Sequence, residues 1–502
     1  MIPVRVDRSR AVVPPHSSLG DGAAVVRPRP DAGFSIVLAV ASILVLITLG
    51  LALVSIVVED SDLSVNHVRS NQAFYAAHAG VEYAVLKLSA NPSWSGLALP
   101  GKTVGKGSFW VAPPDAVDEN GNALPAGQLR VVATGIVGDA KRAIEVHVAP
   151  GMITTYAGTG TNGYSGDGGA ATLAKIKNPE GIALAPNGDL YICDSDNHAI
   201  RRVNFLTGVI TTVAGTGNPG YSGDGAAATA CKLSFPEDVA VLSNGDIYIA
   251  DTGNHAIRKV TAATGTISTI AGTGNPGSSG DGGLATAAKL NSPRGLAIAS
   301  NGDVYIGDRS NNKIRKIVAI TGLISTFAGT GTAGYSGDGG LAALARLSTP
   351  QGLHLHSSGD LYFADSGNNV VRKIAAITGI ITTVAGTGTA GYTGNGGLAT
   401  LARLDSPEAV HLAPTGDIYI ADTGNHAIRK VQAGSGIITT LAGTGAAGYA
   451  GDGGSATLAQ FNRPRGIAVA SSGVYFISDK NNHRIRKVTG ALSVVAWVET
   501  RR

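Results

Sequence analysis

The chain has 502 residues, more than one ordinary domain of roughly 100–200 residues needs, so two or more units are expected. Only 15% of the residues are charged and the formal net charge is +4, which leaves no dense basic surface for phosphate neutralisation and excludes nucleic acid as an expected partner. The two cysteines, Cys193 and Cys231, are too few for a disulfide framework and are expected to be small buried side chains.

An apolar segment lies near the N-terminus. Residues 34–58 contain no charge and, at 1.5 Å per residue, are long enough to cross about 30 Å of hydrocarbon. Arginines precede this segment and acidic residues follow it, starting at Glu59. By the positive-inside rule, the sequence predicts a single membrane span with a cytoplasmic N-terminus and export of everything after residue 60.

The segment GFSIVLAVASILVLITLGLALVS and the later stretch SNQAFYAAHAGVEYAVLKL resemble the start of PilX-type pilus assembly proteins, a type IV pilin-like family, over about residues 29–90. The resemblance implies cleavage by a prepilin peptidase between Gly33 and Phe34 and assembly with other pilin-like subunits. Leu38 stands where major pilins carry a glutamate. The alternative is a plain uncleaved anchor. Both give an inner-membrane protein whose exported part is periplasmic, or at the cell surface if it is assembled into a pilus.

Apolar spacing continues beyond the span and predicts that the helix extends outside the membrane and ends at Pro92. The β-type segments GSFWVAP, GQLRVVATGIVG and AKRAIEVHVAP follow, broken by prolines and a Gly-Asp turn, and predict a small antiparallel sheet. Residues 1–33 are therefore interpreted as a cytoplasmic leader. Residues 34–150 are interpreted as a pilin-like unit with a transmembrane helix and a small β subdomain.

From residue 153 the sequence repeats with a period of 57 residues and without insertions. Each unit contains four apolar β-type runs separated by turn pairs such as Asn187-Gly188, the strongest hairpin signal. Four short strands per unit, six times over, predict a closed β-propeller, since radial closure protects the strand edges. The markers of the period are the AGTG sequences that begin at Ala157, Ala214, Ala271, Ala328, Ala385 and Ala442, and Pro179, Pro236, Pro293, Pro350, Pro407 and Pro464.

The strings NHAIRKV and YIADTGNH resemble NHL repeats over about residues 153–496, which implies a six-bladed propeller at residues 151–498 and a tail at 499–502. The expected fold class is mainly β: a six-bladed β-propeller preceded by a long N-terminal transmembrane helix and a small pilin-like β-sheet. Outer-strand copies outnumber the inner sets by one. We predict that ITTYA at 153–157 closes the ring, with LSVVA at 492–496 as its competitor.

Charged and histidine residues recur at fixed repeat positions. An aspartate ends the second strand of each unit and an arginine follows seven residues later, as in Asp194 and Arg201, which predicts a structural pair. His198, His255, His426 and His483 share one position with Asn312 and Asn369 and are expected to hydrogen-bond at hairpin ends. The Gly-Asp-Gly motif of the link lacks the alternating oxygen ligands of an EF-hand, so its aspartates are expected to hydrogen-bond their own turns.

Functional residues are expected where the copies differ. The residue after each repeated proline is polar and variable and lies at the start of the innermost strand, so the six form a candidate ligand rim, or else a solvated rim: Glu180, Glu237, Arg294, Gln351, Glu408 and Arg465. His354, His356 and His411 are candidate metal ligands, because His354 and His411 replace inner-strand alanines and NHL-type propellers include a copper- and zinc-dependent lyase. No further ligand completes that pattern, so no metal, other cofactor or catalytic residue is predicted.

The sequence favours a binding or display protein over an enzyme. We expect a membrane-anchored, exported, minor pilin-like subunit whose propeller recognises an extracellular protein, a glycan or a surface. The alternative is an exported metal-dependent enzyme of lactonase or lyase type, which requires one asymmetric metal constellation in the channel. A purely structural envelope protein is a third interpretation. Fold alone does not decide among them.

Overall fold

The structure is a computed structural model that describes residues 69–77, 79–80, 84, 96–104, 107–114, 129–137, 140–149, 151–489 and 493–500. The predicted cleavage site and membrane span, residues 33–58, lie outside these residues. No helix within the described ranges is long and apolar enough to cross a membrane. Among the described residues of this region, 69–77, 79–80 and 84 are helical. The predicted fold class is therefore wrong in its long transmembrane helix, and the structure supports a mainly β, propeller-like repeat fold.

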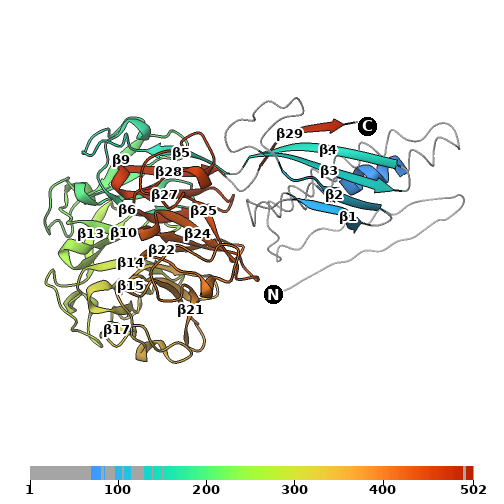
Figure 1. Ribbon diagram of the computed structural model, residues 1–502. Helices are drawn as coiled ribbons and strands as arrows, with labels where there is room; N and C mark the ends of the chain where they lie inside the picture. The colour runs from blue at the N-terminus through green and yellow to red at the C-terminus, as the bar shows by residue number, and fades with distance from the viewer. Residues whose placement is uncertain are drawn as a thin grey trace, which may run out of the picture. The chain divides into compact units, whose positions relative to one another are not determined.

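A five-stranded antiparallel sheet is built from both ends of the chain, in the order β1 (Leu97–Val104), β2 (Gly107–Val111), β3 (Leu129–Val137), β4 (Ala140–Ala149) and β29 (Ser493–Thr500). Small residues let helical residues 69–77 approach this sheet. A Cβ on Gly135 would lie 2.0 Å from the Ala73 carbonyl oxygen. The repeat region is thus inserted in sequence between two neighbouring strands of one sheet (Figure 1).

Six four-stranded antiparallel sheets form the blades of the propeller (Figure 1). Blades 1 to 3 are β6 (Pro179–Leu184), β7 (Leu190–Asp194), β8 (Ala199–Val203), β9 (Ile210–Ala214); β10 (Pro236–Val241), β11 (Ile247–Asp251), β12 (Ala256–Thr261), β13 (Thr266–Ala271); and β14 (Pro293–Ile298), β15 (Val304–Asp308), β16 (Lys313–Ile317), β17 (Ile324–Ala328). Blades 4 to 6 are β18 (Pro350–Leu355), β19 (Leu361–Asp365), β20 (Val370–Ile374), β21 (Ile381–Ala385); β22 (Pro407–Leu412), β23 (Ile418–Asp422), β24 (Ala427–Val431), β25 (Ile438–Ala442); and β26 (Pro464–Val469), β27 (Tyr475–Asp479), β28 (Arg484–Thr489), β5 (Met152–Ala157).

Short 3₁₀ helices recur twice per unit, once in the link and once after the second strand. Those in the links are η1 (Ala171–Leu173), η3 (Ala228–Ala230), η5 (Ala285–Ala287), η7 (Ala342–Leu344), η9 (Ala399–Leu401) and η11 (Ala456–Leu458). Those after the second strand are η2 (Ser195–Asn197), η4 (Thr252–Asn254), η6 (Arg309–Asn311), η8 (Ser366–Asn368), η10 (Thr423–Asn425) and η12 (Lys480–Asn482).

The ring is closed by the strand that precedes the first full unit. β5 pairs with β28, with Ile485 opposite Ala157, so the prediction that ITTYA closes the propeller is confirmed. The competing copy forms part of β29, which pairs with β4 instead. Apolar clusters fill the spaces between adjacent blades, and one of them contains Cys193 and Cys231 as buried free thiols, as predicted. Packing between blades, together with this closing strand, therefore holds the ring together.

Each blade contains one fully buried arginine. In blade 1, Arg201 Nη1 lies 3.2 Å from Asp194 Oδ2, and Arg201 Nη2 lies 2.6 Å from Asp167 Oδ1 in the link. The Tyr164 ring stacks on the same guanidinium, 5.1 Å from Cζ. The predicted structural aspartate–arginine pair is confirmed. The link aspartate was predicted to bond its own turn, and it pairs with this arginine instead. The link runs beside the outer strand β9, where the Gly168 N–H donates to the Ile210 carbonyl at 2.8 Å.

The repeated histidines and asparagines join neighbouring blades. His198 Nδ1 accepts the backbone N–H of Phe235 in blade 2 at 3.1 Å, and Asn312 Oδ1 accepts that of Thr349 in the same way. Burial lowers the pKa of His198, which keeps the ring neutral and able to accept. The predicted hydrogen-bonding role at the hairpin end is confirmed.

Candidate functional site

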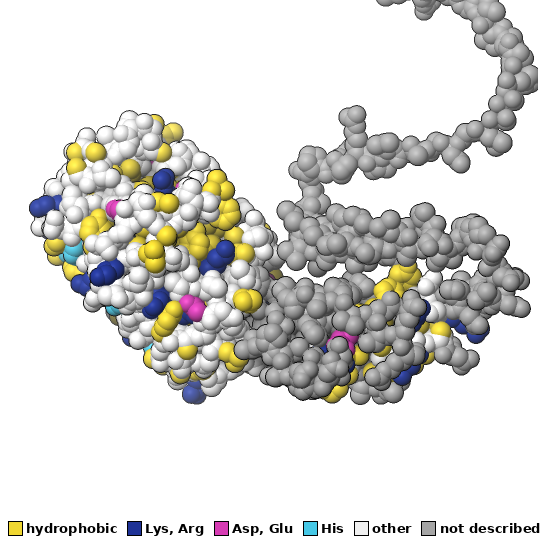
Figure 2. Space-filling model, turned by 90° about the horizontal axis from the view of Figure 1, so that it is seen from above, with side chains coloured by type: hydrophobic (Ala, Val, Ile, Leu, Met, Phe, Trp, Pro, Cys, Tyr) yellow, Lys and Arg dark blue, Asp and Glu magenta, His cyan; other side chains and the backbone are white. Residues whose placement is uncertain are grey.

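The central channel is the candidate site. On the face of the propeller seen in Figure 2, lysine and arginine side chains are scattered among uncharged ones, so charge does not mark a partner surface there. The six innermost strands, β6, β10, β14, β18, β22 and β26, surround a cavity of about 760 Å³. Residues of the hairpins beyond these strands, such as Pro186, Ser471 and Ser472, also line it and are exposed, so the cavity opens at that end.

The six residues of the candidate ligand rim all line the opposite end of the cavity. Arg465 Nη1 lies 2.6 Å from Glu180 Oε2, and Arg465 Nε lies 2.7 Å from Glu408 Oε2. Arg294 pairs with Glu237 and approaches Glu408 at 3.4 Å. The structure thus brings the predicted set together: its five charged members form mutual ion pairs, here called the ion-pair ring, and Gln351 Oε1 accepts a hydrogen bond from Arg294 Nη1 at 3.2 Å.

Additional contacts complete the charge balance of this ion-pair ring. Lys480 Nζ lies 2.7 Å from Glu180 Oε1, and Gln351 Nε2 donates to Ser366 Oγ at 2.8 Å. Burial favours the neutral acid at Glu180, but Arg465, Arg294 and Lys480 outweigh it and hold the pKa of Glu180 below its usual value. The ring is ionised, paired and largely buried, so its charges are already satisfied within the protein.

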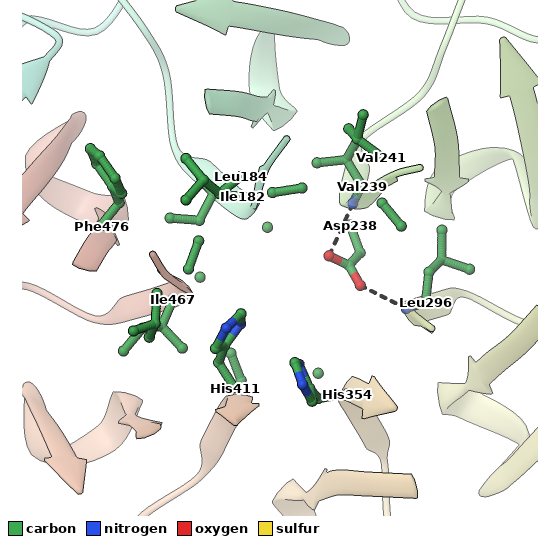
Figure 3. Close-up of a pocket in the computed structure, with 18 of the residues that line it drawn as sticks. Ile182, Leu184, Asp238, Val239, Val241, Leu296, His354, His411, Ile467 and Phe476 are labelled. Atoms are coloured by element: carbon green, nitrogen blue, oxygen red, sulfur yellow. Dashed lines mark hydrogen bonds between the residues drawn. The ribbon is translucent and has the colours of Figure 1, made fainter. Parts of the chain in front are cut away.

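Apolar side chains form most of the channel wall. Figure 3 shows Ile182 and Leu184 of β6, Val239 and Val241 of β10 and Ile467 of β26 around the channel. Three polar side chains interrupt this wall, namely Asp238, His354 and His411. Such a wall suits the apolar body of a ligand, and the polar groups are placed to fix its orientation.

Asp238 is the polar residue that sequence reasoning missed. It occupies a position that is glycine in four of the other copies, such as Gly181, and alanine in one. Its Oδ1 accepts the N–H of Val239 at 3.0 Å, and its Oδ2 accepts the N–H of Leu296 in blade 3 at 2.7 Å (Figure 3). A Cβ on Gly181 would lie 2.5 Å from Asp238 Oδ1, so the neighbouring glycine leaves the room that this carboxylate needs.

The charge of Asp238 has no cationic partner among the described residues. Burial raises its pKa to about 7, against the effect of the two backbone hydrogen bonds. The single carboxylate among six copies that otherwise carry glycine or alanine is the signal in the sequence that could have identified this residue. The other five copies form the equivalent innermost strand without a carboxylate at this position.

The structure brings two of the three candidate metal-ligating histidines together. The rings of His354 on β18 and His411 on β22 lie 4.5 Å apart, centroid to centroid (Figure 3). Burial, followed by the nearby His411 and His356, lowers the pKa of His354 to about 3, and burial lowers that of His411 to about 4. Both rings are therefore neutral near pH 7. His356 instead bonds Ser358 in the hairpin. In the described part of the chain, no group of three or more His, Cys, Asp or Glu residues is arranged to hold a metal ion.

Comparison with protein families identifies the repeats. The NHL repeat model matches residues 233–260 and 461–488, and the teneurin NHL domain model matches residues 138–222 and 267–334. Together with the six blades, these matches show that the repeat region consists of NHL repeats in a β-propeller-like fold. They do not show a PilX-type segment, which stays a prediction.

Two curated relatives are similar to this chain over about three fifths of its length. Protein SUPPRESSOR OF QUENCHING 1, chloroplastic, from Arabidopsis thaliana is 30% identical over 324 residues, which is 62% of this chain and 30% of that protein. NHL repeat-containing protein 2 from Bos taurus is 29% identical over 326 residues, which is 59% of this chain and 44% of that protein. The chain therefore spans less than half the length of these relatives.

Solved structures show the same fold. A protein of unknown function from Bacteroides thetaiotaomicron aligns with a TM-score of 0.51 and 20% identity over 77% of this chain and 91% of that chain. An auxiliary nutrient binding protein from Bacteroides ovatus aligns with a TM-score of 0.50 and 19% identity over 80% of this chain and 99% of that chain. At such identities the likeness concerns the fold alone.

Proposed function

We propose that this chain is a binding protein whose NHL-repeat propeller holds a small, largely apolar ligand in its central channel. The observation that carries the proposal is the cavity of about 760 Å³. Its volume falls within the roughly 300–1,000 Å³ of small-molecule sites, and it has the expected apolar lining with a few converging polar groups. The proposal keeps the predicted binding or display role and moves recognition from the rim, whose charges pair with one another, to the channel wall.

No observation in the described residues favours the alternative function, a metal-dependent enzyme of lactonase or lyase type. His354 and His411 face each other, but the described residues supply no third ligand next to them. Zinc sites in enzymes use three protein ligands and an open position. We therefore carry forward only the binding function.

The pilus-associated role, with other pilin-like subunits and a prepilin peptidase as partners, stays a prediction from the N-terminal sequence. The cleavage site and the apolar segment on which it depends lie outside the described residues. N-terminal sequencing of the protein from its native host tests it directly. A chain that begins at Phe34 supports pilin-type processing, whereas one that begins at Met1 rejects it.

The channel proposal is tested with the neutral dye Nile red, whose emission shifts to the blue in apolar surroundings. The full chain is expected to bind the dye saturably and with one-to-one stoichiometry. The double variant Ala183→Phe, Ala240→Phe should abolish that binding. Both alanines hold the repeat position of His354, so rings placed there would fill the channel.

Leu206→Phe is the matched control, because Leu206 is 87% exposed outside the channel. This variant should bind the dye as the unmodified protein does. Two results would contradict the proposal: no saturable binding by the unmodified chain, or equal binding by the channel-filled variant.

A further inference from the structure

Asp238 is the one carboxylate of the channel wall that pairs with no cation among the described residues. The other charges nearby are matched, since Glu237 pairs with Arg294 and Glu180 pairs with Arg465 and Lys480. Asp238 has only two backbone N–H groups as partners among the described residues. Asp238 is only partly exposed, and a carboxylate largely withdrawn from water without a cation is unfavourable, so the site lacks a positive charge.

The repeat itself shows that this carboxylate is not needed for folding. Four other blades have glycine at the equivalent position, such as Gly181 and Gly295, and blade 5 has Ala409. In each of these blades the innermost strand pairs with the second strand, as it does in blade 2. The aspartate therefore adds an ionisable carboxylate to one side of the channel without being required by the fold.

We propose that the ligand of the channel is an apolar primary amine and that Asp238 is the counter-ion that binds its ammonium group. The inference rests on the proposed channel-binding function and specifies its ligand class. It is carried by the juxtaposition of an uncompensated carboxylate with an apolar wall (Figure 3). An ammonium group supplies both the missing positive charge and N–H donors for the remaining carboxylate lone pairs.

The histidine pair agrees with this ligand class. Both rings are held neutral by burial, so they do not repel a cation. A neutral imidazole carries one nitrogen that accepts a hydrogen bond, so each ring can receive an N–H from an ammonium group. An anionic ligand would instead face the like charge of Asp238 once that carboxyl is ionised, which is unfavourable.

Isothermal titration calorimetry of the full chain with 2-phenylethylamine and its neutral isostere 2-phenylethanol tests the inference. The titrations are run at about pH 8, where the ammonium group is still protonated. The amine is expected to bind at least about tenfold more tightly than the alcohol, in line with one desolvated charge pair. Asp238→Asn should remove this advantage and leave the affinity for the alcohol within about threefold.

Two further variants control the interpretation. Asp238→Gly introduces the residue that four other blades carry, so it is compatible with the fold and should lose the amine preference as Asp238→Asn does. Asp246→Asn removes a carboxylate of the same blade that pairs with Lys259 at 2.9 Å and does not line the channel. That variant should keep the amine preference unchanged.

The results separate this inference from the broader proposal. Equal affinity for amine and alcohol, or amine binding that survives Asp238→Asn, overturns the inference. If the alcohol and Nile red still bind in the channel, the proposed function stands without the amine. If the variant Ala183→Phe, Ala240→Phe still binds the amine, the amine binds outside the channel, and this result also overturns the inference. Loss of binding by every probe overturns both.

Discussion

Removal of a single buried arginine should show how strongly the repeated ion pairs stabilise the propeller. Arg315 in blade 3 is fully buried, with Nη1 3.4 Å from Asp308 Oδ2 and Nη2 2.6 Å from Asp281 Oδ1. Arg315→Met keeps an unbranched, flexible side chain but removes the guanidinium group and its charge. Asp308 would then stay buried with only the hydrogen bonds from the Asn291 N–H and the Asn311 side chain.

The expected loss is large because the remaining carboxylate has no cation. Breaking a buried pair from one side costs about 3–5 kcal/mol in free energy of unfolding. Burial already raises the pKa of Asp308 in the intact protein, so the variant can protonate this group to limit the cost. We therefore expect the lower end of the range, about 3 kcal/mol, at neutral pH.

Urea denaturation of the two full-length proteins measures this difference. Lys316→Met is the matched control, because Lys316 is the next residue on the same strand and its side chain is 25% exposed while it pairs with Asp303. Such a partly exposed pair should cost only about 0–1 kcal/mol. The reasoning is refuted if Arg315→Met costs less than about 1 kcal/mol or no more than Lys316→Met.

The remaining predictions concern pH, ring closure and the C-terminal strand. Because burial raises the pKa of Asp238 from 3.8 to about 7, its contribution to stability is full below 3.8 and is lost as the pH rises towards 7. Asp238→Asn should flatten that decline in urea denaturation across this range, and an unchanged slope would count against the burial of this carboxyl. His483 Nδ1 accepts the Asn178 N–H across the closing blades at 3.2 Å, so His483→Ala should lower the free energy of unfolding by about 1 kcal/mol. His483→Asn should restore the free energy of unfolding, because Asn312 accepts the equivalent N–H, that of Thr349, between blades 3 and 4. An equal loss of stability in both variants would contradict this role of the side chain. A chain that ends before Ser493 should retain the thermal melting transition of the propeller, since β5 closes the ring; loss of that transition would show that β29 is needed for closure.

The blade architecture was accessible from the sequence because it repeats. Equal spacing of the prolines and of the AGTG sequences fixed the number of units, and the surplus outer-strand copy pointed to closure by ITTYA. The pairing of Ser493–Thr500 with β4 was not accessible. Its residues have the same alternating pattern as the outer strands, and the choice between the two sheets depends on contacts far apart in sequence.

The site was only partly predictable, because it too depends on contacts between residues far apart in sequence. The position of Glu180 and its equivalents at one end of the channel follows from their place in the repeat. Their mutual pairing depends on side-chain directions that the repeat does not specify. The link aspartates, such as Asp167, bond an arginine 34 residues away, which a local turn analysis cannot detect. Asp238 was visible as a departure from glycine, but its importance appears only when the cavity is seen around it.

A crystal structure of the full chain with bound 2-phenylethylamine tests the central claim most directly. The account predicts the phenyl ring between the innermost strands, with the ammonium nitrogen about 3 Å from a carboxylate oxygen of Asp238. An amine bound outside the channel, or one whose nitrogen points away from Asp238, would contradict it.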